Sequence, residues 1–135
     1  GILAGGNPSY VDALYHFGLG IGMAFQIQDD IIDLLASPEV SGKDQASDLR
    51  EGKKTLIAMK ALEKGFDLSE FRRDLSHDEV DCVIKKLESL GVLEEVRITA
   101  RDLIENGKKR ISILPDSEEK QLLSDLADYF LSRSY

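Results

Sequence analysis

Apolar side chains recur at helical spacing along most of the chain, and no stretch of useful length alternates between apolar and polar residues as a strand does. After the helix-breaking cluster Gly5-Gly6-Asn7-Pro8, apolar positions return every three or four residues as far as Leu35. We therefore predict a long helix that begins at Pro8 or Ser9 and ends near Leu35. Its apolar stripe contains Tyr10, Leu14, Phe17, Ile21, Ala24 and Ile31.

Shorter stripes predict the remaining elements. The polar segment 37–47 is punctuated by Gly and Pro, which is typical of a loop. Ser76-His77-Asp78-Glu79 is typical of a helix N-terminal cap, and Pro115-Asp116-Ser117 has the same character. We expect helices over 48–64 or 53–64, 68–75, 80–90, 93–114, and from 118 onward. The predicted class is all-α, with residues 1–135 forming a single all-helical unit.

Three glycines lie inside the long predicted helix, at Gly18, Gly20 and Gly22. Each costs roughly 1 kcal/mol of helix stability relative to alanine. We expect another element to pack closely against the backbone at these positions.

Composition narrows the class of protein. The chain has 135 residues, enough for one domain with a core, and 42% of them are hydrophobic. Its single cysteine, Cys82, excludes an internal disulfide and favours a cytoplasmic location. The net charge of -8 argues against a nucleic acid partner. The apolar stretch 13–27 is too short to span a membrane, so no membrane span is expected.

The acidic residues gather where the long helix ends. Residues 1–42 contain no Lys or Arg, yet Asp29, Asp30 and Asp33 lie among them. On a helix these three carboxylates share one face, and Gln26 lies one turn earlier. Like charges so close favour a hard divalent cation, and Mg²⁺ accepts a few carboxylates together with substrate phosphates. A solvated helix end explains the same pattern without a ligand.

Cations follow the acids within a short distance. Gly42-Lys43 and Gly52-Lys53-Lys54-Thr55 are separated by a stretch that contains Asp48. Lysines bind phosphate oxygens as compact charges, and glycine lets the backbone come close to them. Acids and lysines in this order indicate a site for a metal–diphosphate complex.

Three segments of this region follow one another at a specific spacing: Gly22-x-x-Phe25-Gln26-x-x-Asp29-Asp30-x-x-Asp33, then Gly42-Lys43, then Asp48-x-x-x-Gly52-Lys53-x-Thr55. Together they resemble the second aspartate-rich region of the trans-isoprenyl diphosphate synthases, also called polyprenyl synthases. A weaker likeness continues to the C-terminus. The resemblance as a whole implies that the chain is the C-terminal half of an isoprenoid-synthase helical bundle. In such a bundle two aspartate-rich regions hold Mg²⁺ against an allylic diphosphate.

The resemblance also implies roles for the matching residues. Asp29 would be the main Mg²⁺ ligand, with the other two aspartates of the motif in support. Gln26 would lie near the reacting end of the allylic substrate, and Lys43 and Lys53 would bind its diphosphate. Arg50 and Lys54 match weaker positions, and we expect them to be solvated. The implied reaction joins an allylic diphosphate to isopentenyl diphosphate and releases pyrophosphate. The resemblance does not indicate the chain length of the product.

Complete synthases of this family are considerably longer than 135 residues. Because the chain opens on Gly1 and runs directly into apolar residues, we expect a fragment of a longer enzyme. By itself it should be inactive and should form a homo-oligomer. Three alternatives stay open: a non-catalytic regulatory subunit, a class I terpene cyclase, and a purely structural helical bundle. The cyclase would carry an Asn/Ser/Glu metal motif on a later helix instead of the lysine segments.

Overall fold

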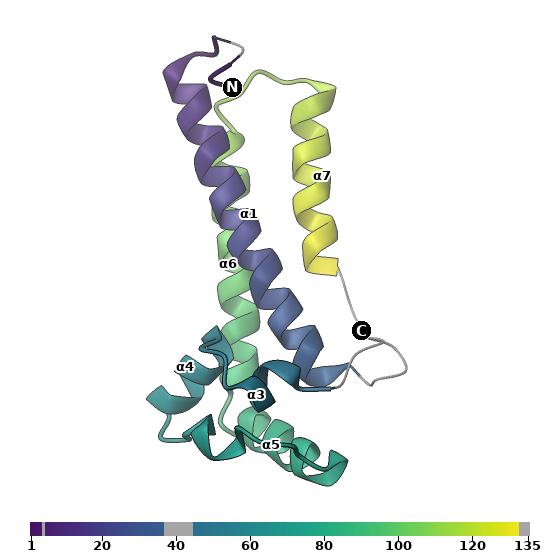
Figure 1. The fold of residues 1–135 in the computed structure, drawn as a ribbon. Coiled ribbons are helices and arrows are strands. Elements are labelled where there is room, and N and C mark those ends of the chain that lie inside the picture. Colours follow the sequence, from purple (N-terminus) through teal and green to yellow (C-terminus); the bar gives the residue numbers. More distant parts are fainter. Residues whose placement is uncertain (4, 37–44, 133–135) are drawn as a thin grey trace. The chain divides into compact units, whose positions relative to one another are not determined.

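The computed structural model describes residues 1–3, 5–36 and 45–132. In this part of the chain every regular element is helical, which confirms the predicted all-α class (Figure 1). The elements are α1 (Pro8–Leu35), α3 (Ser47–Glu51), α4 (Leu56–Glu63), the 3₁₀-helix η1 (Leu68–Phe71), α5 (His77–Ser89), α6 (Val92–Ile111) and α7 (Glu118–Ser132). None of these helices combines the length and the apolar character that crossing a membrane requires.

The residues form two compact units, and the expected single unit over 1–135 stays a prediction. The first unit contains Gly1–Gln26 and Thr99–Arg133, and therefore the beginning of α1, most of α6 and α7. Its buried residues include Phe17, Ile21, Ala24, Ile104 and Ala127. Burial of each large apolar side chain stabilises the fold by about 1.5–3 kcal/mol, so the helical stripes hold this unit together.

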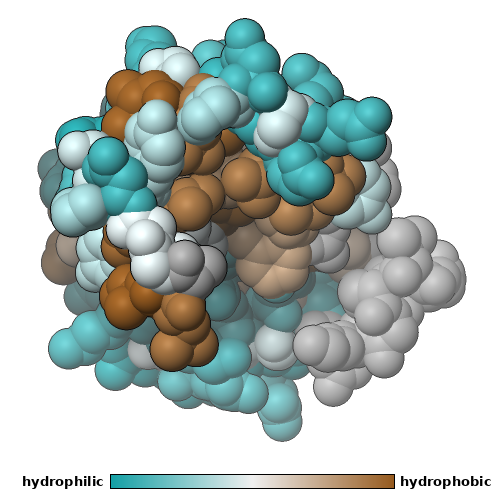
Figure 2. Space-filling view, turned by 90° about the horizontal axis from the view of Figure 1, so that it is seen from above, coloured by the Kyte–Doolittle hydropathy of each residue, from teal (hydrophilic) through white to brown (hydrophobic). Residues whose placement is uncertain are grey.

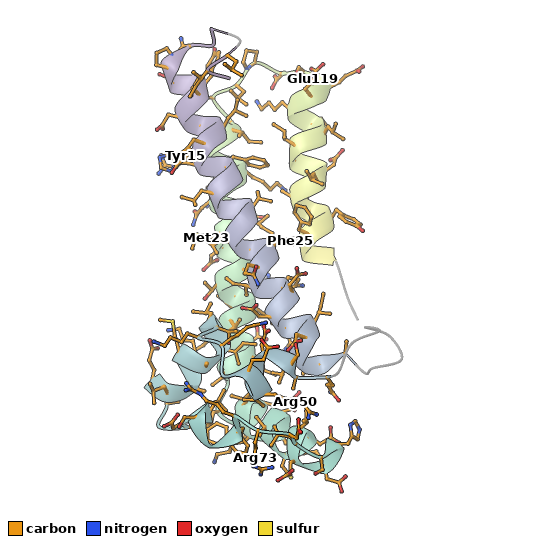
Figure 3. The ribbon with its side chains drawn as sticks, viewed as in Figure 1. Tyr15, Met23, Phe25, Arg50, Arg73 and Glu119 are labelled. Carbon is orange, nitrogen blue, oxygen red and sulfur yellow. The ribbon has the colours of Figure 1, made fainter. Side chains whose placement is uncertain are left out.

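Two side-chain contacts join helices of this first unit. The Phe25 ring of α1 meets Phe130 of α7 edge-on, with ring centroids 5.1 Å apart. Lys108 of α6 pairs with Asp128 of α7 at 2.8 Å. Figure 3 shows Phe25 on the side of α1 near α7, whereas Tyr15 and Met23 project from the opposite side.

The glycines of α1 differ in what surrounds them. A Cβ atom at Gly20 would lie 3.1 Å from the carbonyl oxygen of Leu103, so α6 packs closely on α1 there. At Gly18 and Gly22 a Cβ atom would meet nothing within 4 Å. The predicted close approach is therefore confirmed at Gly20 and wrong at the other two, because only Gly20 faces a neighbouring helix.

The second unit contains Ile27–Ile98, which includes the end of α1, helices α3 to α5 and the beginning of α6. Its core is formed by apolar side chains of each of the longer helices, among them Ile31, Ile57, Ala61, Val80, Val83, Leu87, Leu93 and Val96.

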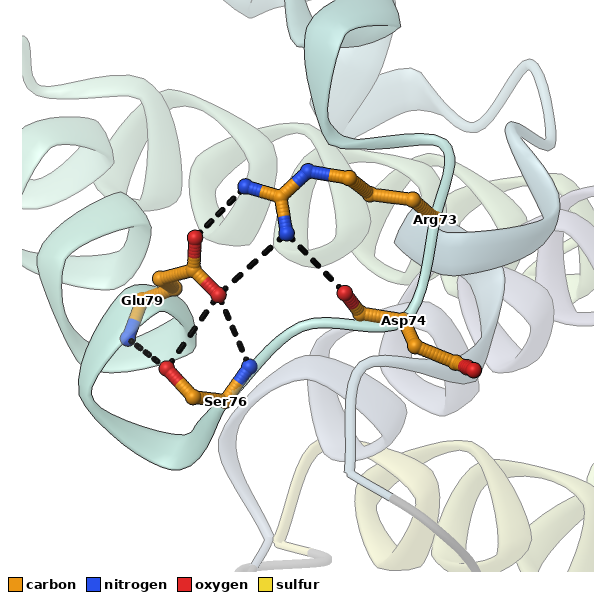
Figure 4. A network of polar contacts seen from close by, with 4 residues as sticks. All are labelled: Arg73, Asp74, Ser76 and Glu79. Atoms are coloured by element: carbon orange, nitrogen blue, oxygen red, sulfur yellow. Dashed lines mark hydrogen bonds and ion pairs between the residues drawn. The ribbon is translucent and has the colours of Figure 1, made fainter.

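Helix α5 begins with the predicted cap. Ser76 and Glu79 form a capping box, in which the Ser76 hydroxyl accepts from the Glu79 N–H and the Glu79 carboxylate accepts from the Ser76 N–H. Arg73 also donates to Glu79 (Figure 4). These bonds, that from Arg73 above all, hold the pKa of Glu79 at about 2. The cap is therefore intact at neutral pH and weakens as the pH falls from 4.5 toward 2.

The segment predicted as one helix to Lys64 is two helices, and the continuous helix from Asp48 was wrong. Gly52 adopts a left-handed conformation with φ of 66°, which ends α3. Thr55 then caps α4, its hydroxyl accepting from the Ala58 N–H. Between them, Lys53 and Lys54 lie outside any helix.

The difference among the glycines of α1 can be tested by mutation. Gly18→Ala should stabilise the chain by up to about 1 kcal/mol, because alanine favours the helix and the added methyl group meets open space. Gly20→Ala should instead destabilise it by about 1 kcal/mol or more, because the methyl group meets the Leu103 carbonyl. Urea unfolding of the two variants would measure this. Equal stability would mean that α1 and α6 separate at no cost.

Candidate functional site

The carboxylate of Asp33 joins the end of α1 to α3. One of its oxygens accepts from the Ser47 hydroxyl, and the other accepts from the Asp48 N–H at 2.9 Å. The Asp33 carbonyl oxygen also accepts from the Ala46 N–H at 2.8 Å. These bonds place the acidic end of α1 beside the segment that carries the cations.

The turn after α3 presents those cations. The Gly52 N–H donates to the Leu49 carbonyl at 3.1 Å, and the Lys53 N–H donates to the Asp48 carbonyl at 2.9 Å. The side chain of Arg72 lies directly over Gly52, where a Cβ atom would overlap it. Glycine is therefore needed here both for the positive φ and for the close approach of Arg72.

Lys53 lies within an acidic environment. Its ammonium group hydrogen-bonds to Asp48 and is 3.2 Å from Glu51. The hydrogen bond to Asp48 is the main reason why its pKa is raised above the usual value, with Glu51 contributing. Lys53 therefore carries a full positive charge at any physiological pH.

Acids and cations line one cleft of about 370 Å³ in the second unit. Of the described residues, its charged ones are Asp30, Asp33, Asp48, Lys53, Lys54, Asp67 and Arg72. The remaining wall is mainly apolar, with Leu34, Ile57 and Leu62 among its residues. Asp30 is buried, with 8% of its surface exposed, so its carboxylate emerges from the core as the sequence predicted. A cleft of this composition suits a ligand that carries both negative and positive charge.

The predicted site residues are only partly brought together. Asp30, Asp33 and Lys53 line the cleft, whereas Asp29 is not among its lining residues. Gln26 lies one turn before the acids on α1 and is exposed. Lys43 falls outside the described residues. The site assigned to these residues therefore stays a prediction.

The donors of the aspartate motif suit a hard divalent cation, since all three side chains offer only carboxylate oxygens. Within the described ranges, no three or more His, Cys, Asp or Glu side chains are grouped closely enough to hold a metal ion alone. A Mg²⁺ ion with several of its ligands supplied by water and phosphate would fit such a sparse donor set. The residues thus fit a metal that bridges protein and substrate.

Sequence reasoning missed Arg72 and Asp67. Both line the cleft, although they follow α4 in the sequence and the other charged residues of the cleft precede it. No motif marks them, and the pair Arg72-Arg73 gives no indication of which arginine faces the cleft. Arg50, expected to be solvated, instead donates to the Gln45 carbonyl at 3.2 Å and lies 3.9 Å from Asp74.

Comparison with known proteins identifies the family. The polyprenyl synthetase family model matches residues 1–88, and the chain belongs to this family. It is 42% identical over 135 residues to geranylfarnesyl diphosphate synthase of Natronomonas pharaonis, covering 99% of this chain and 40% of that protein. The chain thus spans well under half the length of this relative.

Solved structures share the fold. Geranylgeranyl pyrophosphate synthetase of the archaeon Geoglobus acetivorans superposes with a TM-score of 0.83 at 37% identity, over 96% of this chain and 40% of that one. Geranylgeranyl pyrophosphate synthase of Corynebacterium glutamicum, complexed with isoprenyl diphosphate and magnesium, superposes with a TM-score of 0.78 at 29% identity. The superposition covers 97% of this chain and 40% of the Corynebacterium glutamicum chain. The expected helical bundle of an isoprenoid synthase is confirmed.

The contact between Gly52 and Arg72 generates a prediction. Gly52→Ala should lower stability by about 1–2 kcal/mol through its left-handed backbone, and should displace the Arg72 side chain. Gly65→Ala is the matched control, because Gly65 also has a positive φ, of 78°, but open space around it. Both variants should lose similar stability in urea. Only Gly52→Ala should shift the NMR signal of the Arg72 Nε–H group, and an unchanged signal would contradict the contact.

Proposed function

We propose that the protein containing this chain is a prenyltransferase that condenses an allylic diphosphate with isopentenyl diphosphate. It would form a linear prenyl diphosphate and release pyrophosphate. The observation that carries this proposal is the cleft in which Asp30 and Asp33 meet Lys53, in a chain of the polyprenyl synthetase family. The chain spans about 40% of the length of its relatives, so the activity is assigned to the whole protein. These 135 residues alone should be inactive.

Mg²⁺ is the proposed cofactor, and it would supply positive charge where the diphosphate leaves. Support comes from the carboxylate-only donor set and from the magnesium complex of the Corynebacterium glutamicum relative. Asp29 and Asp30 would hold the metal. Asp33 would contribute mainly by fixing the turn that carries Lys53, since Ser47 and Asp48 already donate to both of its oxygens.

Lys43 and Lys53 would bind the allylic diphosphate, and Gln26 would lie near the reacting end of that substrate. The positive charge of Lys53 stabilises negative charge that develops on the departing pyrophosphate. The double bond of isopentenyl diphosphate then attacks the allylic carbon, and a proton is lost. No protein nucleophile is needed, because the residues act by electrostatics and positioning.

We also propose that the chain associates with itself. Apolar side chains are exposed on α1 at Tyr15, Leu19 and Met23, and on α7 at Leu122, Leu126 and Tyr129. Figure 2 shows hydrophobic residues at the surface among hydrophilic ones. Exposed apolar patches favour association in water.

The metal role of the aspartates predicts distinct losses of activity. In the full-length protein, Asp29→Ala should lower kcat about a hundredfold or more, as the loss of an electrostatic stabiliser does. Asp12→Ala, at an exposed position of the same helix, should leave kcat unchanged. Asp33→Ala should lower stability, because two hydrogen bonds are lost, and should lower kcat less than Asp29→Ala. Steady-state assays at saturating Mg²⁺ would measure this, and unaltered kinetics of Asp29→Ala would reject the metal assignment.

Self-association predicts a concentration-dependent mass. Sedimentation equilibrium of the 135-residue chain should give a dimer or a larger species. Replacing Leu19 and Leu126 by Gln should shift the equilibrium toward monomer, because both side chains are exposed and apolar. Glu119→Gln, at a polar position of α7, is the control and should not shift it. A monomer at all concentrations would disprove the proposal.

A further inference from the structure

Among the described residues, three cations line the cleft, and they differ in what surrounds them. The ammonium group of Lys53 is already bound by Asp48 and lies 3.2 Å from Glu51. In the part of the chain that the structure describes, the side chains of Lys54 and Arg72 make no hydrogen bond and no ion pair. Lys54 and Arg72 are thus the cations of this cleft that no acid pairs with among the described residues.

The stem of Arg72 packs against a turn, although the residue is exposed. Its Cγ, Cδ and Nε atoms lie over Gly52, the residue whose turn carries Lys53 and Lys54. This contact positions the guanidinium group at the turn without using any of its hydrogen-bond donors. Its charge also lowers the pKa of Asp67, although the main cause of that shift is the hydrogen bond from the Ser69 N–H. The stem thus contacts the turn, and no ion pair neutralises the guanidinium group among the described residues.

We propose that Arg72 is a further diphosphate-binding residue of this cleft. The inference rests on the proposed function and assigns a contact that no motif of the sequence carries. Arginine presents a planar fork of donors that matches two phosphate oxygens at once, whereas lysine acts as a single charge. Arg72 and Lys54 would face the diphosphate, and Lys53 would hold the turn through Asp48 and Glu51 while adding its charge.

The composition of the cleft supports this division of roles. Asp30, Asp33 and Asp48 would repel a diphosphate unless cations offset their charge. Lys53 offsets Asp48 by direct contact, so it contributes less net charge toward a ligand. Arg72 has no such partner among the described residues, and its charge remains available.

Binding of inorganic pyrophosphate with Mg²⁺ to the 135-residue chain, measured by isothermal titration calorimetry, tests the proposal. Arg72→Gln should weaken binding about tenfold, since a charged hydrogen bond contributes about 1.5–3 kcal/mol. Arg73→Gln is the matched control: the same charge is removed at the next residue, but Arg73 pairs with Glu79 outside the cleft. It should bind pyrophosphate as the unmodified chain does. Arg72→Lys keeps the charge but loses the fork, and should fall between the two.

A second pair of variants separates a contact from a folding effect. Gly52→Ala keeps Arg72 but displaces it, and should weaken pyrophosphate binding, whereas Gly65→Ala should not. Dimethylallyl diphosphate in place of pyrophosphate should give the same ratios, since both carry the same diphosphate group.

The outcomes separate the two proposals. Pyrophosphate binding by the unmodified chain that is unaffected by Arg72→Gln would overturn the role of Arg72 and leave the proposed function standing. Equal weakening by Arg72→Gln and Arg73→Gln would also overturn it, because general charge would then explain the loss. If the unmodified chain bound neither diphosphate in the presence of Mg²⁺, the diphosphate site itself would be rejected.

Discussion

The two hydrogen bonds that Asp33 accepts from Ser47 and Asp48 hold the acidic end of α1 against the segment that carries the cations. The bonds join residues 14 and 15 positions apart in sequence. A carboxylate that accepts from a backbone N–H and a hydroxyl fixes both the position and the direction of the chain that donates them. The turn at Gly52 follows this attachment directly in the chain, because α3 lies between them. Asp33 therefore shapes the site whether or not it touches a metal.

The second constraint is the left-handed turn at Gly52. It stops α3 after one turn, so Lys53 and Lys54 lie between two helices and not on the surface of a longer one. The same glycine leaves room for Arg72, which comes from the end of η1. One residue without a side chain thus brings together three cations from two separate segments.

The electrostatic character of the cleft follows from this arrangement. Carboxylates from α1 and α3 face lysines and an arginine within one hollow, most of whose remaining wall is apolar. Such a cleft favours a ligand that carries both kinds of charge, as a metal–diphosphate complex does. A simple anion would be repelled by the acids, and a simple cation by the lysines.

The sequence by itself determined the all-α class, the bounds of α1 and the likeness to the polyprenyl synthases. It also determined the cap of α5 and that of α7, where the Ser117 hydroxyl accepts from the Lys120 N–H. These depend on periodicity, local capping and fixed spacing, which are properties of neighbouring residues. It did not determine that Gly20 alone among the glycines of α1 meets another helix, because that depends on which face α6 covers. It left open whether the helix that ends near Lys64 begins before or after Gly52, and it gave no indication of Arg72 in the cleft. Contacts between residues far apart in the chain decide these features, and only the tertiary structure brings those residues together.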